Sequence, residues 1–277
     1  MIHGSFRERC NVIRFSIIVV CLNAGEELHK TIGSVLEQTF DDYEIVVKDG
    51  GSTDGSVEKI AENEKIRVIR KPDTSLYDAM NQAIDEAQGE YLLFLNCGDY
   101  LYDRNVLMNV SACLPADAAR SVKIAYGNIY NRTVESAIMS NPRIDAFACY
   151  RNIPCHQACF YENKLMKERR YNPAYRVRAD YDHFLGCFFE EGIRPLYLPL
   201  FIASYEGGGF SETEANIRRS KEEHKEITAH YMSRLQIVWY KFLLLLTLAP
   251  LRTRIAQNPK LSGAYNALKS KLYRHRG

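Results

Sequence analysis

The sequence predicts an α/β protein with a doubly wound, mostly parallel β-sheet and a helical extension at its C-terminal end. Three observations predict this class. Mainly apolar runs alternate with amphipathic helical segments over residues 15–95, polar residues follow the ends of several of these runs, and residues 212–249 show helical patterning. A chain of 277 residues is long enough for one large α/β domain with a small appendage.

The first hundred residues carry the clearest pattern. The run FSIIVVCL from Phe15 is typical of a strand buried on both faces, and the segments between the predicted strands place apolar residues at helical spacing. The predicted strands cover residues 15–22, 43–48, 66–70 and 91–95, and the predicted helices cover residues 26–38 and 75–87. Strands and helices that alternate at this spacing predict parallel pairing.

The alternation loosens after residue 127. Residues 128–150 are predicted as a hairpin or an irregular excursion, and a helix is predicted over residues 181–190. Two more helices, over 212–231 and 237–249, form the C-terminal extension.

Polar residues follow three of the predicted strands at Asn23, at 49–56 and at 96–99. Ligands of parallel sheets bind beyond the carboxyl ends of the strands, so these clusters are expected to converge on one crevice. Glycines in 49–56 let a ligand approach the backbone, and Asp49 stands where a strand ends. The same segment is also compatible with a tight turn whose Asp or Ser residue caps a helix.

Several function classes fit poorly. The segment 49–56 is not a GxGxxG loop after the first strand, which argues against a dinucleotide-dependent dehydrogenase, and GxxxxGK[ST] is absent, which argues against a P-loop protein. A net charge of only +2 argues against a nucleic-acid partner. The segment from Cys155 to Cys159 lacks a second ligand pair with zinc-site spacing.

Three segments resemble one known family: SIIVVCLNAGEEL from Ser16, YEIVVKDGGSTDGS from Tyr43, and DTSLYDAMNQAIDEAQGEYLLFLNCGD from Asp73. Together they are similar to the family 2 glycosyltransferases with the GT-A fold. Within that family, the chain most resembles the branch that builds bacterial capsular, colanic-acid-like and related exopolysaccharides. The likeness is dense over residues 15–105 and weaker to about residue 210.

The resemblance implies a nucleotide-sugar donor at the strand ends, with Asp49 bonded to a pyrimidine. The donor-binding residues it implies are Asn23, Asp49, Asp78 and Asn81. Gly51 and Asn96 join them from the polar clusters at the strand ends, and Arg178 is compatible with a diphosphate contact or with a solvated surface position. It also implies that Asp99 is the surviving acid of a D-x-D motif and holds Mg²⁺ or Mn²⁺. Many members read DADD where this chain reads NCGD, so more of the metal coordination is left to the diphosphate and water. Without that resemblance, Asp99 is equally compatible with a turn.

In the second half, the resemblance implies that Asp180 is the general base, with Asp182 as the alternative. An Asp at this place also commonly caps a helix. His156 and Gln157 are implied as acceptor or active-site residues, although His156 is also compatible with a metal ligand or a core histidine.

The apolar segment 237–249 is shorter than the roughly 20 residues that a membrane-spanning helix needs. From Arg252 onward, seven Lys or Arg residues follow without an acidic residue. This pattern predicts a helix in the interface of an anionic membrane, or alternatively a helix packed on the domain. The chain lacks the apolar run of a signal peptide at its start, and we expect a cytoplasmic protein at the inner face of the cell membrane.

The predicted organisation is an N-terminal tail over 1–14, a nucleotide-sugar-binding half over 15–127, an acceptor or catalytic half over 128–211, and a helical extension with a basic tail over 212–277. The expected activity is inverting transfer of a sugar to a hydroxyl acceptor, on a glycan or a polyprenyl-diphosphate-linked glycan. The alternatives are a sugar-phosphate nucleotidylyltransferase and a non-catalytic saccharide-binding scaffold.

Overall fold

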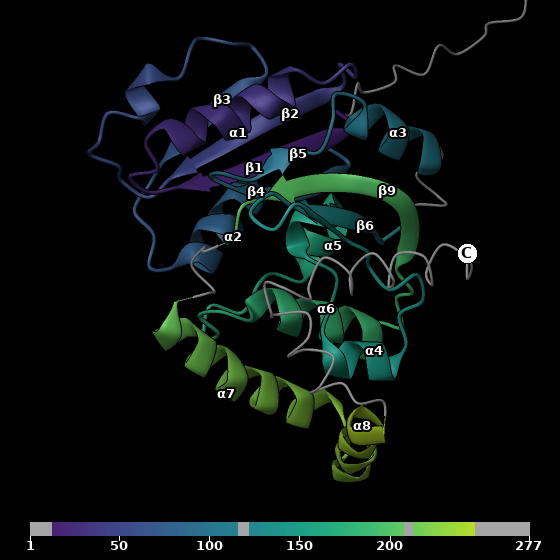
Figure 1. Ribbon diagram of the computed structural model, residues 1–277. Coiled ribbons are helices and arrows are strands. Elements are labelled where there is room, and N and C mark those ends of the chain that lie inside the picture. Colours follow the sequence, from purple (N-terminus) through teal and green to yellow (C-terminus); the bar gives the residue numbers. More distant parts are fainter. Residues whose placement is uncertain (1–12, 116–121, 208–212, 247–277) are drawn as a thin grey trace, which may run out of the picture.

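The computed structural model describes residues 13–115, 122–207 and 213–246 (Figure 1). Most of the predicted N-terminal tail and all of the basic tail from Arg252 lie outside these ranges. The described residues form one mixed β-sheet with helices on both faces, and two further helices end the described chain.

The sheet has nine strands, in the order β3-β2-β1-β4-β8-β6-β9-β5, with β7 paired to β6 beside β8. These strands are β1 Phe15–Cys21, β2 Tyr43–Asp49, β3 Ile66–Arg70, β4 Tyr91–Asn96, β5 Tyr100–Leu101, β6 Ile124–Asn131, β7 Ser136–Ile138, β8 Cys159–Glu162 and β9 Leu196–Tyr205. The four strands predicted in the first hundred residues are confirmed, and their pairing is parallel throughout.

The rest of the sheet mixes directions. β8 runs antiparallel to both β4 and β6, so β6 has the same direction as β4, and β9 pairs with β6 in parallel. β6 and β7 form an antiparallel hairpin, which confirms one of the two structures predicted after residue 127. Because most of the paired residues are in parallel strand pairs, the mostly parallel, doubly wound sheet predicted from the sequence is confirmed.

Eight α-helices accompany the described strands: α1 Glu26–Leu36, α2 Leu76–Glu86, α3 Val106–Cys113, α4 Ala146–Arg151, α5 Asn163–Glu168, α6 Ala179–Phe189, α7 Glu214–Tyr231 and α8 Arg234–Leu246. Two apolar cores lie on opposite faces of the sheet, because side chains alternate in direction along a strand. Ile18 and Val20 of β1 contribute to the core under α2, α6 and α7, whereas Ile17 and Val19 contribute to the core under α1 and α3.

The C-terminal helices lie beyond α6 and α4, away from the sheet (Figure 1). α7 contacts α6, and α8 contacts both α4 and α7. Thr213 is the N-cap of α7, where its side chain accepts a hydrogen bond from the backbone of Asn216. Within the described ranges, no helix is both long enough and apolar enough to cross a membrane.

Candidate functional site

The loops that follow β1 and β2 are hydrogen-bonded into one structure. The backbone N–H of Asn23 donates to Ser52 Oγ at 2.9 Å, and Asn23 Oδ1 accepts the backbone N–H of Thr53 at 2.8 Å. The backbone N–H of Gly25 donates to Asp54 Oδ2 at 2.9 Å. Asn23 has a positive φ of 51°, a conformation that Asn tolerates better than most residues. These contacts hold two of the predicted polar clusters together.

Asp49 is buried at the end of β2. Its Oδ1 accepts the backbone N–H groups of Gly51 and Ser52 at 3.2 and 2.8 Å, and the Ser52 hydroxyl at 2.6 Å. Burial raises the pKa of Asp49, but these hydrogen bonds outweigh it, so the pKa lies below its ordinary value. Among the described residues, Oδ2 receives no hydrogen bond and can accept one from a ligand.

Asp99 lies just past β4, and its side chain is buried. Oδ2 accepts the side-chain amides of Asn96 at 3.1 Å and Gln157 at 3.0 Å. Burial raises the pKa of Asp99, although the Gln157 amide opposes the rise. Oδ1 accepts no hydrogen bond within the described part of the chain.

A single carboxylate oxygen with no bonded partner suits a hard cation that takes its other ligands from substrate and water. The described residues contain no group of three or more His, Cys, Asp or Glu side chains able to hold a metal ion. Asp99 is therefore compatible with Mg²⁺ or Mn²⁺ only when a bound diphosphate completes the coordination.

His156 links the Asp99 cluster to Asp180. Its Nε2 lies 3.2 Å from Asn96 Nδ2, and its Nδ1 lies 3.6 Å from Asp180 Oδ2. His156 stands in a short 3₁₀ turn directly before β8, the strand that pairs with β4, and α6 carries Asp180. The side chains of His156 and Asp180 are each 19% exposed, so a substrate can reach them.

Asp180 accepts hydrogen bonds at Oδ1 from the Tyr77 hydroxyl at 3.0 Å and from the backbone N–H of Tyr181 at 2.8 Å. Burial raises the pKa of Asp180, but the contacts with His156 and Tyr77 outweigh burial, and the pKa lies below its ordinary value. Asp180 is thus an anion at neutral pH with one oxygen turned to His156.

Strand register relates Asp49 to this cluster. Cys21 of β1 lies opposite Asp49 of β2, and the preceding residue, Val20, lies opposite Asn96 of β4. Because neighbouring strands are about 4.8 Å apart, Asp49 and Asn96 are separated by about 10 Å across β1. Asp49, Asp99 and Asp180 therefore lie at the same end of the sheet.

Two predicted donor residues make hydrogen bonds within the protein. Asp78 Oδ2 accepts both the backbone N–H and the hydroxyl of Thr74, at the start of α2. Asn81 pairs with the backbone of Tyr171, donating to its carbonyl at 2.8 Å and accepting its N–H at 3.0 Å. These contacts stabilise the fold, and donor contact by either residue stays a prediction.

Asp182 and Arg178 point toward the C-terminal helices. Asp182 accepts a hydrogen bond from the Tyr231 hydroxyl at 3.1 Å, while Arg178 donates to Ser220 Oγ at 2.7 Å and to Asn152 Oδ1 at 3.0 Å. Positions 180 and 182 differ by about 200° around a helix, so Asp182 cannot share the His156 contact of Asp180. The structure brings Asp180, not Asp182, to the strand ends.

Tyr77 is a site residue that the sequence reasoning missed. Its hydroxyl lies between Asp180 Oδ1 and the carbonyl of Val177, at 3.0 and 2.8 Å. It belongs to the YDAMN part of the family-like segment, directly beside Asp78, so the pattern was present but did not say which neighbour faces the site.

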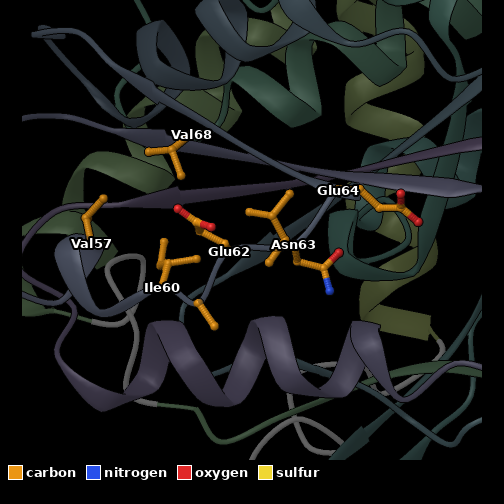
Figure 2. A pocket seen from close by; sticks show the side chains of 8 residues that line it. Val57, Ile60, Glu62, Asn63, Glu64 and Val68 are labelled. Atoms are coloured by element: carbon orange, nitrogen blue, oxygen red, sulfur yellow. The ribbon is translucent and has the colours of Figure 1, made fainter.

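A hollow at the edge of the sheet lies apart from these residues. A cavity of about 510 Å³ is bounded by residues 57–68, at the edge strand β3, and Figure 2 shows Val57, Ile60, Glu62 and Val68 around it. None of the predicted site residues lines this cavity. The hydrogen-bonded cluster at the strand ends, rather than this edge hollow, is the candidate site.

Comparison with protein families shows that the model described as "Glycosyl transferase family 2" matches residues 16–183. A Mycobacterium tuberculosis protein named "PGL/p-HBAD biosynthesis glycosyltransferase" is 37% identical over 210 residues, which cover 72% of this chain and 79% of that protein. The Asp99 cluster and Asp180 both fall inside the family match.

Solved structures show the same fold at low identity. A mannosyltransferase from Pyrobaculum calidifontis in complex with GDP-Man and Mn²⁺ superposes with a TM-score of 0.61, at 17% identity over 94% of this chain and 80% of that one. S. aureus TarS 1–349 in complex with UDP-GlcNAc gives a TM-score of 0.59, at 18% identity over 79% of this chain and 71% of that one. In another TarS 1–349 structure the match spans 70% of this chain and 60% of that one, with a TM-score of 0.57.

Proposed function

Because this chain belongs to glycosyl transferase family 2 and is a glycosyltransferase, we propose that it moves a sugar from a nucleoside-diphosphate donor to a hydroxyl acceptor with inversion at the anomeric carbon. Family membership sets aside the nucleotidylyltransferase and the non-catalytic scaffold that the sequence left open. The observation that supports the proposal is the chain of contacts Asp99–Asn96–His156–Asp180, which links the proposed cation ligand to the proposed base.

Asp180 acts as the general base in this proposal. Its lowered pKa keeps it ionised at neutral pH, and its partial exposure lets an acceptor hydroxyl approach. The hydroxyl proton passes to Asp180 while the oxygen forms a bond to the anomeric carbon. The bond from that carbon to the diphosphate breaks on the opposite face, and the nucleoside diphosphate leaves with its electron pair.

The donor half of the site uses the joined loops after β1 and β2. Asn23, Asp49 and Gly51 flank the nucleoside, with Asp49 Oδ2 available to a base edge. Asp99 Oδ1 would hold Mg²⁺ or Mn²⁺, which neutralises negative charge on the diphosphate when bound. The donors seen with structural neighbours, UDP-GlcNAc and GDP-Man, support a nucleoside-diphosphate sugar without choosing between them.

We further propose that the acceptor is a lipid-linked glycan at an anionic membrane surface on the cytoplasmic side. α8 supports this, because it is apolar on two opposite sides. Ile237, Tyr240 and Leu244 pack against the domain, whereas a second apolar row faces solvent. That exposed row consists of Leu235, Val238, Trp239, Phe242, Leu245 and Leu246.

The spacing of the exposed row, three and four residues apart, places it on one helix side. An apolar helix side next to a basic sequence is typical of interfacial helices. The basic sequence follows α8 from Arg252, with seven cationic residues and no acid. Synthesis of capsular or related exopolysaccharide stays a prediction, since the 37% identical relative is named for PGL/p-HBAD biosynthesis.

The base assignment is tested by Asp180→Asn, with Asp182→Asn as the matched control on the same helix. With a panel of UDP- and GDP-sugars and Mn²⁺, kcat should fall about a hundredfold or more for Asp180→Asn, because an amide cannot take the proton. Donor affinity from calorimetry should stay unchanged, and Asp182→Asn should retain turnover. Near-normal kcat in Asp180→Asn contradicts the role.

The metal assignment is tested by Asp99→Asn. Donor binding in Mn²⁺ should weaken by about tenfold or more, because the amide loses the charge that holds the cation. With a chelator, wild type and variant should bind donor equally. Identical titrations of the two proteins with and without Mn²⁺ would remove Asp99 from the metal site.

Membrane contact is tested by flotation with vesicles. The variant Val238→Asp/Phe242→Asp should lose binding to anionic vesicles, whereas Ile217→Asp, which changes an exposed apolar residue of α7, should bind as wild type does. Equal flotation of all three proteins would contradict the role of α8.

A further inference from the structure

Glu223 of α7 is a buried acid whose contacts are almost all with backbone. Oε1 accepts the N–H of Arg176 at 2.9 Å, and Oε2 accepts the N–H groups of Val177 at 3.0 Å and Arg178 at 2.9 Å. Its side chain is 8% exposed, and Arg219 supplies one further contact at 3.2 Å. A carboxylate that accepts three consecutive N–H groups is held by charge-assisted hydrogen bonds, which are the stronger kind.

The three N–H groups belong to the segment that leads into Asp180. Arg178 is the N-cap residue of α6 and forms no side-chain cap of its own. The first N–H groups of a helix have no partner within the helix, and a negative charge there is favourable. The N–H of Arg178 belongs to this set, so Glu223 supplies, from another helix, a negative group beside the start of α6.

The same segment is fixed on its carbonyl side by Tyr77, whose single hydroxyl hydrogen is shared between the carbonyl of Val177 and Asp180 Oδ1. Glu223 holds the N–H of Val177 and Tyr77 holds its carbonyl, so the peptide plane on each side of this residue has a buried partner. Asp180 follows three residues later, in the first turn of α6.

Neighbouring residues on α7 contact the same segment. Ser220 Oγ accepts a hydrogen bond from Arg178 at 2.7 Å, and the His224 ring stacks on Tyr181 with centroids 5.0 Å apart. Ser220, Glu223 and His224 are spaced three and four residues apart, so they lie on one side of α7. One helix face thus holds the backbone before Asp180 and the ring after it.

We propose that Glu223 is a positioning residue for the reaction, which holds the start of α6 so that the Asp180 carboxylate stays where the acceptor hydroxyl meets it. The proposal rests on the proposed base role of Asp180. Glu223 lies beyond the family match, which ends at residue 183. The proposal therefore adds a residue of the C-terminal helices to those on which turnover depends. A shift of about 1 Å at a reacting group can cost about a hundredfold in rate, so the anchor has consequences for turnover.

The test compares Glu223→Gln with Glu222→Gln, an exposed neighbour whose contact is Arg218 at 3.5 Å. Glutamine keeps the size of the side chain but replaces one accepting oxygen with an NH₂ group that faces backbone N–H. For Glu223→Gln we expect kcat to fall about tenfold or more, with donor affinity unchanged, because the donor loops do not contact Glu223. Glu222→Gln should match wild type in both.

A double variant separates positioning from general damage. If Glu223 acts through Asp180, adding Glu223→Gln to Asp180→Asn should leave the residual turnover unchanged, because the base is already lost. A general structural defect would lower kcat by the same factor in both backgrounds, and that result overturns the proposal.

Glu223→Asp keeps the charge and both oxygens, and serves if Glu223→Gln does not fold. Its side chain is shorter by one methylene, so it should lower kcat while donor affinity persists. Normal kcat in a folded Glu223→Gln or Glu223→Asp, with Asp180→Asn inactive, overturns this proposal alone. Near-normal kcat in Asp180→Asn overturns it together with the base assignment, since Glu223 would then have no base to position.

Discussion

Removal of the Tyr77 hydroxyl tests how the fold holds Asp180. Tyr77 is buried at the start of α2, and its hydroxyl has two acceptors, the Asp180 carboxylate and the carbonyl of Val177. Tyr171 offers a matched control, because its ring packs on Tyr77 with centroids 5.3 Å apart. Within the described residues, the buried Tyr171 hydroxyl has no hydrogen-bond partner.

The two Tyr→Phe changes should have different effects on the free energy of unfolding. A hydrogen bond to a charged group contributes about 1.5–3 kcal/mol, so Tyr77→Phe should lower the free energy of unfolding by about 2–3 kcal/mol. An unsatisfied buried hydroxyl costs about 1–3 kcal/mol, so Tyr171→Phe should be neutral or stabilising. Both changes remove one oxygen and keep the ring, so a loss of ring packing cannot explain a difference in stability between the two variants.

The pKa of Asp180 supplies a second readout. The Tyr77 hydroxyl helps to lower this pKa below the ordinary 3.8, so Tyr77→Phe should raise it. Because the folded pKa lies below the unfolded one, stability from this carboxylate is present above pH 3.8 and disappears as pH falls through the folded pKa. The stability deficit of Tyr77→Phe should therefore be present at pH 7 and shrink under strongly acidic conditions.

Urea unfolding of wild type and both variants at pH 7 measures the stability difference, and the pH dependence of kcat follows Asp180. The acid limb of the plot of kcat against pH should move to higher pH in Tyr77→Phe and stay at the same pH in Tyr171→Phe. Equal losses of stability in the two variants, or an acid limb that moves equally in both, would refute the assignment of the Tyr77 hydrogen bonds.

Three other outcomes follow from the packing. Burial lowers the pKa of His183 from 6.5 to about 4, so between these pH values the unfolded chain binds a proton that the folded chain does not. The free energy of unfolding should therefore fall by about 3 kcal/mol from pH 6.5 to pH 4, and urea titrations of a His183→Gln variant should show a smaller fall. Gly89→Ala should destabilise by about 2 kcal/mol or more in thermal melts, because a Cβ there would stand 2.5 Å from the backbone N of Ser16. Gly33→Ala, in α1 with no atom within 4 Å of an added Cβ, should instead raise stability by up to about 1 kcal/mol.

The parallel half of the fold could be predicted because its signals are local. β1 and β4 are nearly continuous apolar runs, β2 and β3 are short segments rich in Ile and Val, and α2 begins within a residue of its predicted start. The second half could not be predicted in the same way. β8 has only four residues, and β9 contains Pro199, which is unusual inside a strand, so neither shows a clear period.

The site divides similarly. Register alone would place Asp49 near Asn96, since each is the last residue of a strand that pairs with β1. The meeting of Asp99 with Asp180 depends on β8 lying between β4 and β6 and on the orientation of α6, which are both long-range features. The choice between Asp180 and Asp182 likewise needed the packing of α6 against α7, because the sequence fixes only their angular separation.

The place of β8 has a consequence for how such an enzyme can diversify. β8 pairs with β4 at Tyr91 and Leu92 and with β6 at residues 124–126, and it directly follows the turn with His156 and Gln157. This turn contacts β4, the strand that ends at Asn96. The separation between Asn96 and His156 is thus set by the packing of this turn on the sheet rather than by loops farther along the chain. Those loops can therefore vary in sequence while Asn96 and His156 keep their positions.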